Sequence, residues 1–389
     1  PHATFHEFYK DMHAIGKDRP RPKESTIFAT QSTHKLLAGL SQASQILVQD
    51  SETSTFDRDV FNEAYLMHTS TSPQYAIIAS CDVAAAMMEP PGGTSLVEES
   101  ILEALDFRRA MRKVDEEFGD SWWFKVWGPD NLAEEGIGSR EDWMLRDNED
   151  WHGFGNLAPG FNMLDPIKAT IITPGLSMDG GFSASGIPAG IVTKYLAEHG
   201  VIVEKTGLYS FFIMFTIGIT KGRWNTMLTE LQQFKDDYDR NQPLWRVLPE
   251  FVAKHPRYER VGLKDLSDSI HGIYKANDIA RLTTEMYLSN MEPAMKPADA
   301  FAKMAHREID RVEIDDLAGR VTSVLLTPYP PGIPLLIPGE RFNNTIVRYL
   351  KFARDFNEKF PGFETDIHGL VQESADGKKR YYVDCVRQD

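Results

Sequence analysis

Short apolar runs alternate with amphipathic segments between residues 169 and 238, and this alternation restricts the possible folds more than any other feature. The runs 169–173, 201–203 and 211–217 have the length and composition of buried strands. Helical patterns follow in one segment that opens near Pro188 and in another over 222–238. Strands that alternate with helices are typical of a layered arrangement. We therefore predict an α/β fold.

The regions on either side contribute further predicted elements. Before the alternation we expect a loop over 1–22, strands at 26–30 and 44–48, an amphipathic segment at 56–67, a helix from Ser72-Pro73 to about Met88, and a helix over 95–118 after a break at Pro90-Pro91. After it we expect mostly helix over 241–295 and strands at 321–326 and 380–386.

The predicted helix over 95–118 has one apolar face. We assign to the buried face Leu96, Ile101, Leu105 and Phe107, and to the solvent face Glu98, Glu99, Arg108, Arg109 and Lys113. Residues 128–150 are polar and rich in Gly, Asp and Glu, so we predict a surface loop and a candidate domain boundary there.

Composition limits the classes of function. With 42% hydrophobic and 25% charged residues the chain fits a soluble globular protein, and no apolar run reaches the roughly 20 residues that span a bilayer. A formal charge of −15 disfavours nucleic acid and favours cationic small molecules. Cys81 and Cys385 are far apart and support neither a disulfide framework nor a zinc site. We expect a cytoplasmic protein with no metal and no membrane partner.

The tetrapeptide Ser32-Thr33-His34-Lys35 places a lysine beside an imidazole and two hydroxyls. An enzyme that uses pyridoxal phosphate (PLP) needs such groups, because a lysine amine forms a Schiff base with the cofactor aldehyde while hydroxyl and imidazole groups hold the phosphate and the ring. We expect the strands 26–30 and 44–48 to desolvate Lys35 partly, which favours the neutral, nucleophilic amine. A salt-bridged structural lysine is the alternative.

Blocks spread over nearly the whole chain carry a family resemblance. They are residues 28–48, 61–73, 151–154, 164–168, 186–189, 203–207, 328–334 and 361–369. In this order they resemble the bacterial ornithine/lysine/arginine decarboxylases, which belong to the aspartate aminotransferase fold group. The resemblance implies an incomplete fold type I PLP-dependent large domain in residues 1–165 and a C-terminal α+β small domain in 166–389. The chain would then be the C-terminal half of such an enzyme. The other half would carry the aspartate that pairs with the pyridine nitrogen and the histidine that stacks on the ring.

The resemblance also assigns roles to individual residues. It implies that Lys35 carries PLP covalently and returns a proton to Cα after CO₂ leaves, with His34 as a second catalytic residue. Ser32 and His34 would bind the cofactor phosphate or ring edge, and Ser70 would donate a hydroxyl to the phosphate of a neighbouring subunit. From the residues alone, Ser32 could instead cap a turn, and Ser70 could belong to an N-cap cluster for the helix that begins at Pro73.

Substrate recognition is assigned to Glu204, which follows the predicted strand 201–203. A carboxylate at a strand end could pair with the distal cation of a basic amino acid, although a surface glutamate is the alternative. The blocks 203–210 and 363–369 look closest to lysine-specific members. We therefore predict conversion of L-lysine to cadaverine and CO₂, with arginine to agmatine as the second choice and a non-catalytic interface module as a third.

Two further features are assigned to structure rather than chemistry. His152 is expected to be a satisfied structural histidine, and residues 329–332 are expected to form a proline-fixed turn near the site. For partners, the resemblance implies a homodimer that shares its active sites, with dimers assembled into rings of ten.

Overall fold

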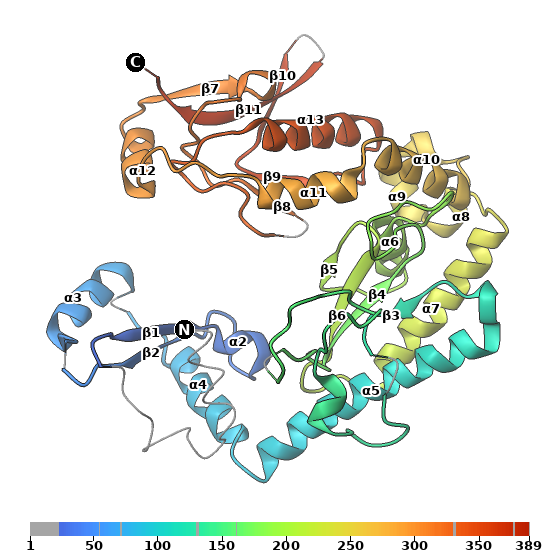
Figure 1. The fold of residues 1–389 in the computed structure, drawn as a ribbon, viewed down its shortest axis with the longest axis horizontal. Helices are drawn as coiled ribbons and strands as arrows, with labels where there is room; N and C mark the ends of the chain where they lie inside the picture. The colour runs from blue at the N-terminus through green and yellow to red at the C-terminus, as the bar shows by residue number, and fades with distance from the viewer. Residues whose placement is uncertain are drawn as a thin grey trace.

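The computed structural model describes residues 23–53, 55–70, 72–129, 132–160, 162–329, 332–375 and 378–388. The predicted loop over 1–22 lies outside the described residues, as do Pro330 and Pro331 of the predicted turn. Figure 1 shows three parts along an arc: an N-terminal arm, a central unit around a sheet, and a C-terminal unit.

The arm, residues 23–88, contains two strands and three helices. They are β1 (Ile27–Gln31), α2 (Thr33–Leu36), β2 (Gln45–Gln49), α3 (Arg58–His68) and α4 (Tyr75–Met87). The two strands pair antiparallel, which confirms both predicted strands to within one residue. Helix α3 begins where the Asp57 carboxylate accepts hydrogen bonds from the backbone N–H groups of Asp59 and Val60.

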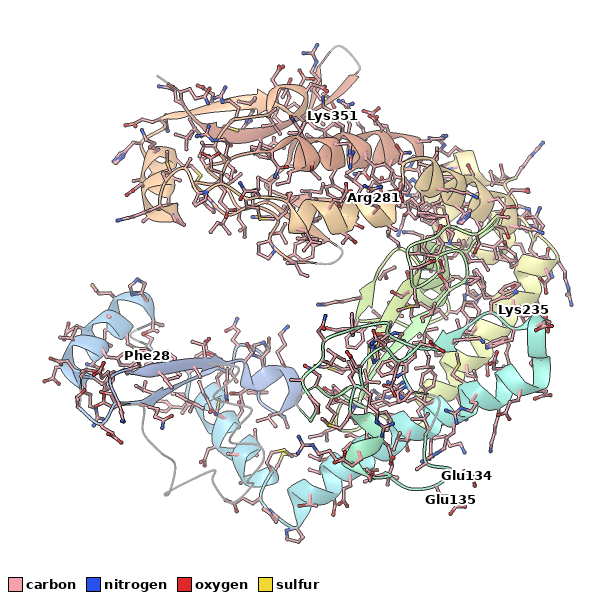
Figure 2. The ribbon with its side chains drawn as sticks, viewed as in Figure 1. Phe28, Glu134, Glu135, Lys235, Arg281 and Lys351 are labelled. Atoms are coloured by element: carbon pink, nitrogen blue, oxygen red, sulfur yellow. The ribbon has the colours of Figure 1, made fainter. Side chains whose placement is uncertain are left out.

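The strands of the arm are not buried, contrary to our expectation. Within the described residues of the arm, only Thr33, Ala43, Ser51 and Ala84 are buried. Phe28 on β1 is 52% exposed and forms a small aromatic cluster with Phe56 and Phe61, at ring-centroid distances of 5.9 Å. Figure 2 shows Phe28 on the arm, well away from Lys235 in the central unit and Lys351 in the C-terminal unit. Within the described residues, no further layer of helices or strands buries the faces of this two-stranded sheet.

The break at Pro90-Pro91 separates α4 from the long helix α5 (Gly92–Phe118), as predicted. Leu105 and Phe107 are buried as expected, and Leu96 and Ile101 are partly buried. The prediction that Arg108 faces solvent was wrong, because this residue is only 3% exposed. The Arg108 side chain extends toward the sheet of the central unit, where two backbone carbonyls accept hydrogen bonds from its guanidinium.

The central unit is built on a four-stranded antiparallel sheet in the order β3-β4-β6-β5. Its strands are β3 (Lys125–Val126), β4 (Lys168–Ile172), β5 (Lys205–Thr206) and β6 (Ser210–Met214). These confirm the predictions at 169–173 and, in its first half, at 211–217. The prediction at 201–203 was wrong, because Val201 N–H bonds back to Leu196 O at the end of the preceding helix and pairing begins only near Lys205.

Helices cover this sheet and form with it the largest hydrophobic core among the described residues. They are α5 together with α6 (Ala189–Glu198), α7 (Lys221–Asp239), α8 (Leu244–Val247), α9 (Pro249–Lys254) and α10 (Leu263–Ala276). The predicted helices near Pro188 and over 222–238 are confirmed as α6 and α7, and the helical stretch after residue 241 is confirmed as well. The core takes residues from every one of these helices.

The segment predicted as a surface loop over 128–150 is only partly at the surface. It contains a short 3₁₀ helix, Arg140–Trp143, whose Trp143 is buried in a small cluster with Leu105 and Leu164. Exposed Glu134 and Glu135 mark its outer edge in Figure 2. The loop therefore anchors to α5 through Trp143 and through hydrogen bonds that Arg109 of α5 donates to the carbonyls of Ala133 and Gly136.

The C-terminal unit has its own core, in which α11 and α13 pack beside a three-stranded antiparallel sheet in the order β10-β11-β7. Its elements are α11 (Ile279–Leu288), α12 (Pro297–Ala305), β7 (Ile309–Glu313), β8 (Thr327–Tyr329), α13 (Asn344–Lys359), β9 (Asp366–His368), β10 (Val371–Ala375) and β11 (Lys378–Val386). The predicted strand at 380–386 is confirmed as β11. The one at 321–326 was wrong, because Val321, Thr322 and Leu326 form only isolated bridges.

The proposed domain boundary at 165/166 stays a prediction. Strand β3 on one side of it pairs with β4 on the other, so the sheet continues across that position. Among the described residues no helix is both long and apolar enough to cross a membrane.

Candidate functional site

The Lys35 segment forms one helical turn, α2, held by bonds to its own backbone and to the following loop. Lys35 N–H donates to Ser32 O at 3.0 Å, and His34 N–H donates to Ala43 O at 3.2 Å. The His34 ring also bonds Ala43 O through Nδ1, at 2.8 Å. Because a carbonyl oxygen only accepts, Nδ1 carries the hydrogen, and Nε2 is left without a partner among the described residues.

The predicted cofactor residues differ in exposure. Ser32 and Lys35 are exposed, His34 is half-buried, and Thr33 is buried. Within the described residues neither the Lys35 amine nor the Ser32 hydroxyl has a hydrogen-bond or ion-pair partner, and Ser32 does not cap the turn with its side chain. The expected desolvation of Lys35 was therefore wrong for this chain, because the strands on either side of it are uncovered. Salt-bridging of Lys35, the alternative, is likewise not seen among the described residues.

Ser70 lies in the connection between α3 and α4. Its hydroxyl accepts a hydrogen bond from Ser72 N–H at 3.1 Å and remains exposed. Helix α4 begins after Gln74, whose side chain makes no cap bond, so the N-cap alternative for Ser70 was wrong. Among the described residues no hydrogen bond joins Ser70 to the α2 turn.

Glu204 lies in the central unit, one residue before β5. Its N–H donates to Phe212 O at 2.9 Å, which fixes the backbone beside β6, while its carboxylate is exposed and makes no ion pair within the described part of the chain. No hydrogen bond or ion pair between described residues joins Glu204 to the α2 turn. The roles of Lys35, His34, Ser32, Ser70 and Glu204 thus stay predictions.

His152 has the surroundings of a structural histidine. It is 3% exposed, and its Nδ1 accepts a hydrogen bond from Phe154 N–H at 2.8 Å. Its Nε2 lies 3.4 Å from a Glu149 carboxylate oxygen. Its ring packs between Trp151 and Phe154, at centroid distances of 4.5 and 5.1 Å. These contacts fix the turn around residue 152 and leave the ring no access to a substrate.

Arg108 links α5 to the central sheet and was missed as a buried group. Its guanidinium donates to Trp127 O and Lys168 O, both at 2.9 Å, and burial lowers its pKa to about 10. Gly128 carries φ +155°, and a Cβ there would come within 2.9 Å of the guanidinium, so the glycine makes room for it. Its charge hid this role in the sequence, because arginine is ordinarily assigned to the solvent face of a helix.

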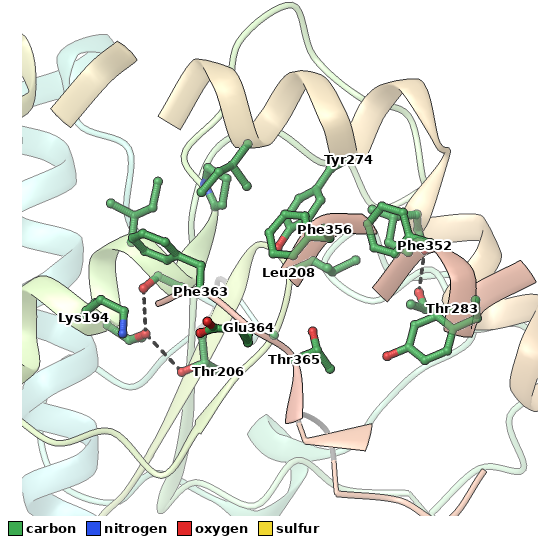
Figure 3. A pocket seen from close by; sticks show the side chains of 18 of the residues that line it. Lys194, Thr206, Leu208, Tyr274, Thr283, Phe352, Phe356, Phe363, Glu364 and Thr365 are labelled. Atoms are coloured by element: carbon green, nitrogen blue, oxygen red, sulfur yellow. Dashed lines mark hydrogen bonds between the residues drawn. The ribbon is translucent and has the colours of Figure 1, made fainter. Parts of the chain in front are cut away.

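A cavity where the central and C-terminal units meet has none of the predicted site residues in its lining. It has a volume of about 820 Å³ and is bounded by α6, α10, α11, α13 and the segments 202–208 and 362–365 (Figure 3). None of Lys35, Ser32, Ser70 and Glu204 lines it. The only sequence signal was indirect, since two of its walls fall in the resemblance blocks at 203–207 and 361–369.

Comparison with known proteins identifies the family. A model described as "Orn/Lys/Arg decarboxylase, major domain" matches residues 1–223, and one described as "Orn/Lys/Arg decarboxylase, C-terminal domain" matches residues 280–387. The chain therefore belongs to the ornithine/lysine/arginine decarboxylase family, as the resemblance implied, and its fold combines the major and C-terminal domains of that family.

Individual relatives show how similar this chain is to particular members of the family. Lysine decarboxylase LdcA of Pseudomonas aeruginosa is 49% identical over 100% of this chain and 52% of its own length. Biodegradative arginine decarboxylase of Escherichia coli is 38% identical over 99% of this chain and 53% of its own. The solved structure of lysine decarboxylase A from Pseudomonas aeruginosa has a TM-score of 0.89 and 50% identity over 94% of this chain and 50% of that one. The chain spans about half the length of the relatives it matches and corresponds to their C-terminal half.

Proposed function

We propose that the protein containing this chain is a PLP-dependent decarboxylase that converts L-lysine to cadaverine and CO₂. The observation that carries the proposal is the 49% identity to lysine decarboxylase LdcA over the whole chain, which exceeds the 38–40% identity to three other lysine decarboxylases and the 38% identity to an arginine decarboxylase. Arginine to agmatine is the second candidate, favoured by that latter similarity. The proposal also includes the fold type I arrangement of the large domain and a cytoplasmic location.

The donor set around α2 fits PLP chemically. A phosphate monoester carries close to two negative charges and takes several donors. The Ser32 hydroxyl is unengaged among the described residues, and Nε2 of His34 is the one ring nitrogen not used on Ala43 O. With Nδ1 already protonated, Nε2 donates to a phosphate only in the imidazolium form, which adds a positive charge. We propose that these two groups hold the phosphate and that Lys35 holds the aldehyde carbon.

The cofactor, when bound, supplies the electron sink that accepts the electron pair left on Cα as the carboxylate departs as CO₂. The chain contributes proton transfer and orientation. Lys35 lies one residue from the His34 ring, and we propose that its ammonium returns a proton to Cα. Glu204 pairs with the distal ammonium of lysine, which selects a basic side chain of the right length.

The arm supplies the argument for a partner subunit. Its strands and α3 expose Phe28, Leu47, Val60 and Met67, all at least 49% accessible in this chain. Exposed apolar side chains in this number favour burial against another protein surface. We propose that a homodimer covers the arm, that Ser70 serves the phosphate of the neighbouring subunit, and that dimers build a ring of ten.

The test is substrate turnover by the full-length protein loaded with PLP. Release of CO₂ is measured from lysine, arginine and ornithine for the wild type, for Glu204→Gln and for the control Glu134→Gln, whose side chain is exposed on the outer loop. We expect lysine to be preferred. Glu204→Gln should lower kcat/KM for lysine about ten- to a hundredfold, the range for loss of a hydrogen bond to a charged group, whereas the control should not.

Three results would contradict parts of this proposal. A preference for arginine would select the second candidate. Equal losses on all three substrates would remove Glu204 from specificity. A PLP-loaded protein that releases no CO₂ from any of them would support the non-catalytic module instead.

A further inference from the structure

The cavity of about 820 Å³ between the central and C-terminal units falls within the range of roughly 300–1,000 Å³ typical of small-molecule sites. It uses none of the residues proposed for PLP or substrate binding, so an inference from it stands independently of the proposed function.

Most of the cavity wall is apolar and aromatic. Tyr274, Phe352 and Phe356 form a stacked set, with Phe356 at a centroid distance of 5.3 Å from Tyr274 and 5.8 Å from Phe352. Leu208 lies beside them in Figure 3. Tyr274 and Phe352 pack against both hydrophobic cores, so this wall belongs to the rigid part of the fold. Such a surface accepts an alkyl or aryl group and gains free energy from each apolar carbon that it removes from water.

One end of the cavity carries a cation without an acceptor. Lys194 Nζ lies 5.2 Å from the centroid of Phe251 and 5.3 Å from that of Phe363, and among the described residues it makes no hydrogen bond or ion pair. Burial lowers the pKa of Lys194 by more than the nearby Glu364 and Glu198 carboxylates raise it, so these carboxylates compensate its charge only in part. Figure 3 shows Lys194 at one end of the lining and Phe352 at the other.

The neighbouring polar groups do not complete this site. Glu364 turns a carboxylate oxygen to Gly362 N–H at 2.7 Å and forms no ion pair with Lys194. Thr206 donates its hydroxyl to Thr193, which donates in turn to Gly190 O. The donors of both threonines are therefore used within the protein, and the Lys194 ammonium is the group at this end with hydrogens to give.

We propose that this cavity binds an amphipathic monocarboxylate, with its carboxylate on Lys194 and its alkyl chain against Leu208, Tyr274, Phe352 and Phe356. A carboxylate supplies the acceptor that Lys194 lacks, and a charge-assisted bond of this kind is stronger in a partly water-excluded site. A cationic ligand would meet the ammonium directly. The segment 202–208 that forms one wall also carries Glu204, so occupancy would be felt next to the proposed substrate residue.

The test is calorimetric titration of the full-length protein with hexanoate, octanoate and decanoate, and with octylamine and octanol as head-group controls. We expect affinity to rise about fourfold for each added methylene, from about 0.8 kcal/mol per CH₂. Octanoate should bind at least about tenfold more tightly than octanol, and octylamine should not bind. Equal binding of octanoate and octylamine would overturn the proposal. The absence of decanoate binding at millimolar concentration would overturn it too, because it would mean that other parts of the assembled protein fill the cavity.

Variants locate the binding. Lys194→Met keeps an apolar side chain of similar length and should weaken octanoate about tenfold or more without changing octanol. Lys113→Met, which changes an exposed lysine on α5 that does not line the cavity, is the matched control and should leave octanoate binding within about twofold. Gly190→Leu tests the volume, since a Cβ at Gly190 meets nothing within 4 Å and a larger side chain can grow into the cavity. It should abolish binding of both ligands. Thermal unfolding shows whether each variant is folded, and unchanged octanoate binding by folded Lys194→Met and Gly190→Leu would refute the site.

Discussion

Helices α3 and α13 begin in the same way and end in different surroundings. Each is capped by a side-chain oxygen, from Asp57 in one and Asn343 in the other. Yet α3 has no buried residue, whereas α13 buries Ile346, Val347, Tyr349, Leu350, Ala353 and Phe356. The local signals for a helix are therefore equal in the arm and in the C-terminal unit. The difference lies in what covers the apolar face, because the described residues of the arm give α3 only the partial cover of Phe28 and Phe56 on Phe61.

This contrast connects the fold to the proposed function. The arm carries Lys35 and Ser70, and its apolar side chains are exposed in the single chain. The central and C-terminal units have complete cores of their own. If protein surfaces from outside this chain cover the exposed apolar side chains of the arm, the same surfaces would also enclose the residues proposed to bind the cofactor. The following experiments break or sharpen that comparison.

Thiol labelling should give the largest difference. Burial raises the pKa of Cys385 in the C-terminal core to about 12, whereas Cys81 on α4 of the arm is partly exposed. Because the thiolate is the reactive form, a maleimide should label Cys81 at least about a hundredfold faster at neutral pH. Peptide mapping after timed quenching measures both sites. Equal rates would mean that the C-terminal core opens as readily as the arm, and the comparison would fail.

Truncation of one aromatic residue in each region should show the next largest effect. Phe107 is fully buried in the central core, so Phe107→Ala should lower the free energy of unfolding by about 3–5 kcal/mol. Phe28→Ala in the arm should cost under about 1 kcal/mol in the isolated chain and should instead weaken self-association. Denaturant unfolding and sedimentation over a concentration series measure the two. A loss of several kcal/mol for Phe28→Ala without any change in association would contradict the account of the arm.

The buried arginine of α5 gives an intermediate effect. Arg108→Met leaves Trp127 O and Lys168 O without their donors and should cost about 2–3 kcal/mol. The control Arg112→Met removes a guanidinium four residues along the same helix that has no hydrogen bond or ion pair among the described residues, and should change stability by under about 0.5 kcal/mol. Urea midpoints with unchanged slopes compare the two. Similar midpoints for both variants would show that Arg108 does not hold α5 to the sheet.

Two glycine substitutions should change the free energy of unfolding least, and one of them should increase it. Gly272 is exposed within α10, and a Cβ there meets nothing within 4 Å, so Gly272→Ala should stabilise by about 0.5–1 kcal/mol. Gly186→Ala should destabilise, because its Cβ would come within 2.4 Å of His271 Nδ1 and 2.7 Å of Gly175 Cα. Melting temperatures of the two variants should therefore move in opposite directions. A shift in the same direction would show that the loop at Gly186 yields easily.

The sequence predicted most elements but not their burial. Short apolar runs located β1, β2, β4 and β11 correctly, because strand propensity is local. The run 201–203 failed, since the end of α6 uses Val201 N–H before any strand can pair. Arg108 failed because its guanidinium finds two carbonyls distant in sequence, which no periodicity reveals.

The candidate site shows the same limit. The family and the residues proposed for PLP came from motifs, and comparison confirmed the family. The expected desolvation of Lys35 could not be judged from its flanking strands, because apolar strands are buried only where another layer exists. The cavity at Lys194 could not be predicted from the sequence, because its walls come from segments far apart in the chain.

The central claim is that Lys35 holds the cofactor, and reduction by borohydride tests it directly. The full-length protein, loaded with PLP, is reduced, digested and mapped by mass spectrometry, with Lys35→Ala and the exposed-lysine control Lys23→Ala treated alongside. We expect the phosphopyridoxyl mass on the peptide that contains Lys35 in the wild type and in Lys23→Ala, and no such adduct in Lys35→Ala. An adduct on a different lysine, retained when Lys35 is replaced, would contradict the assignment.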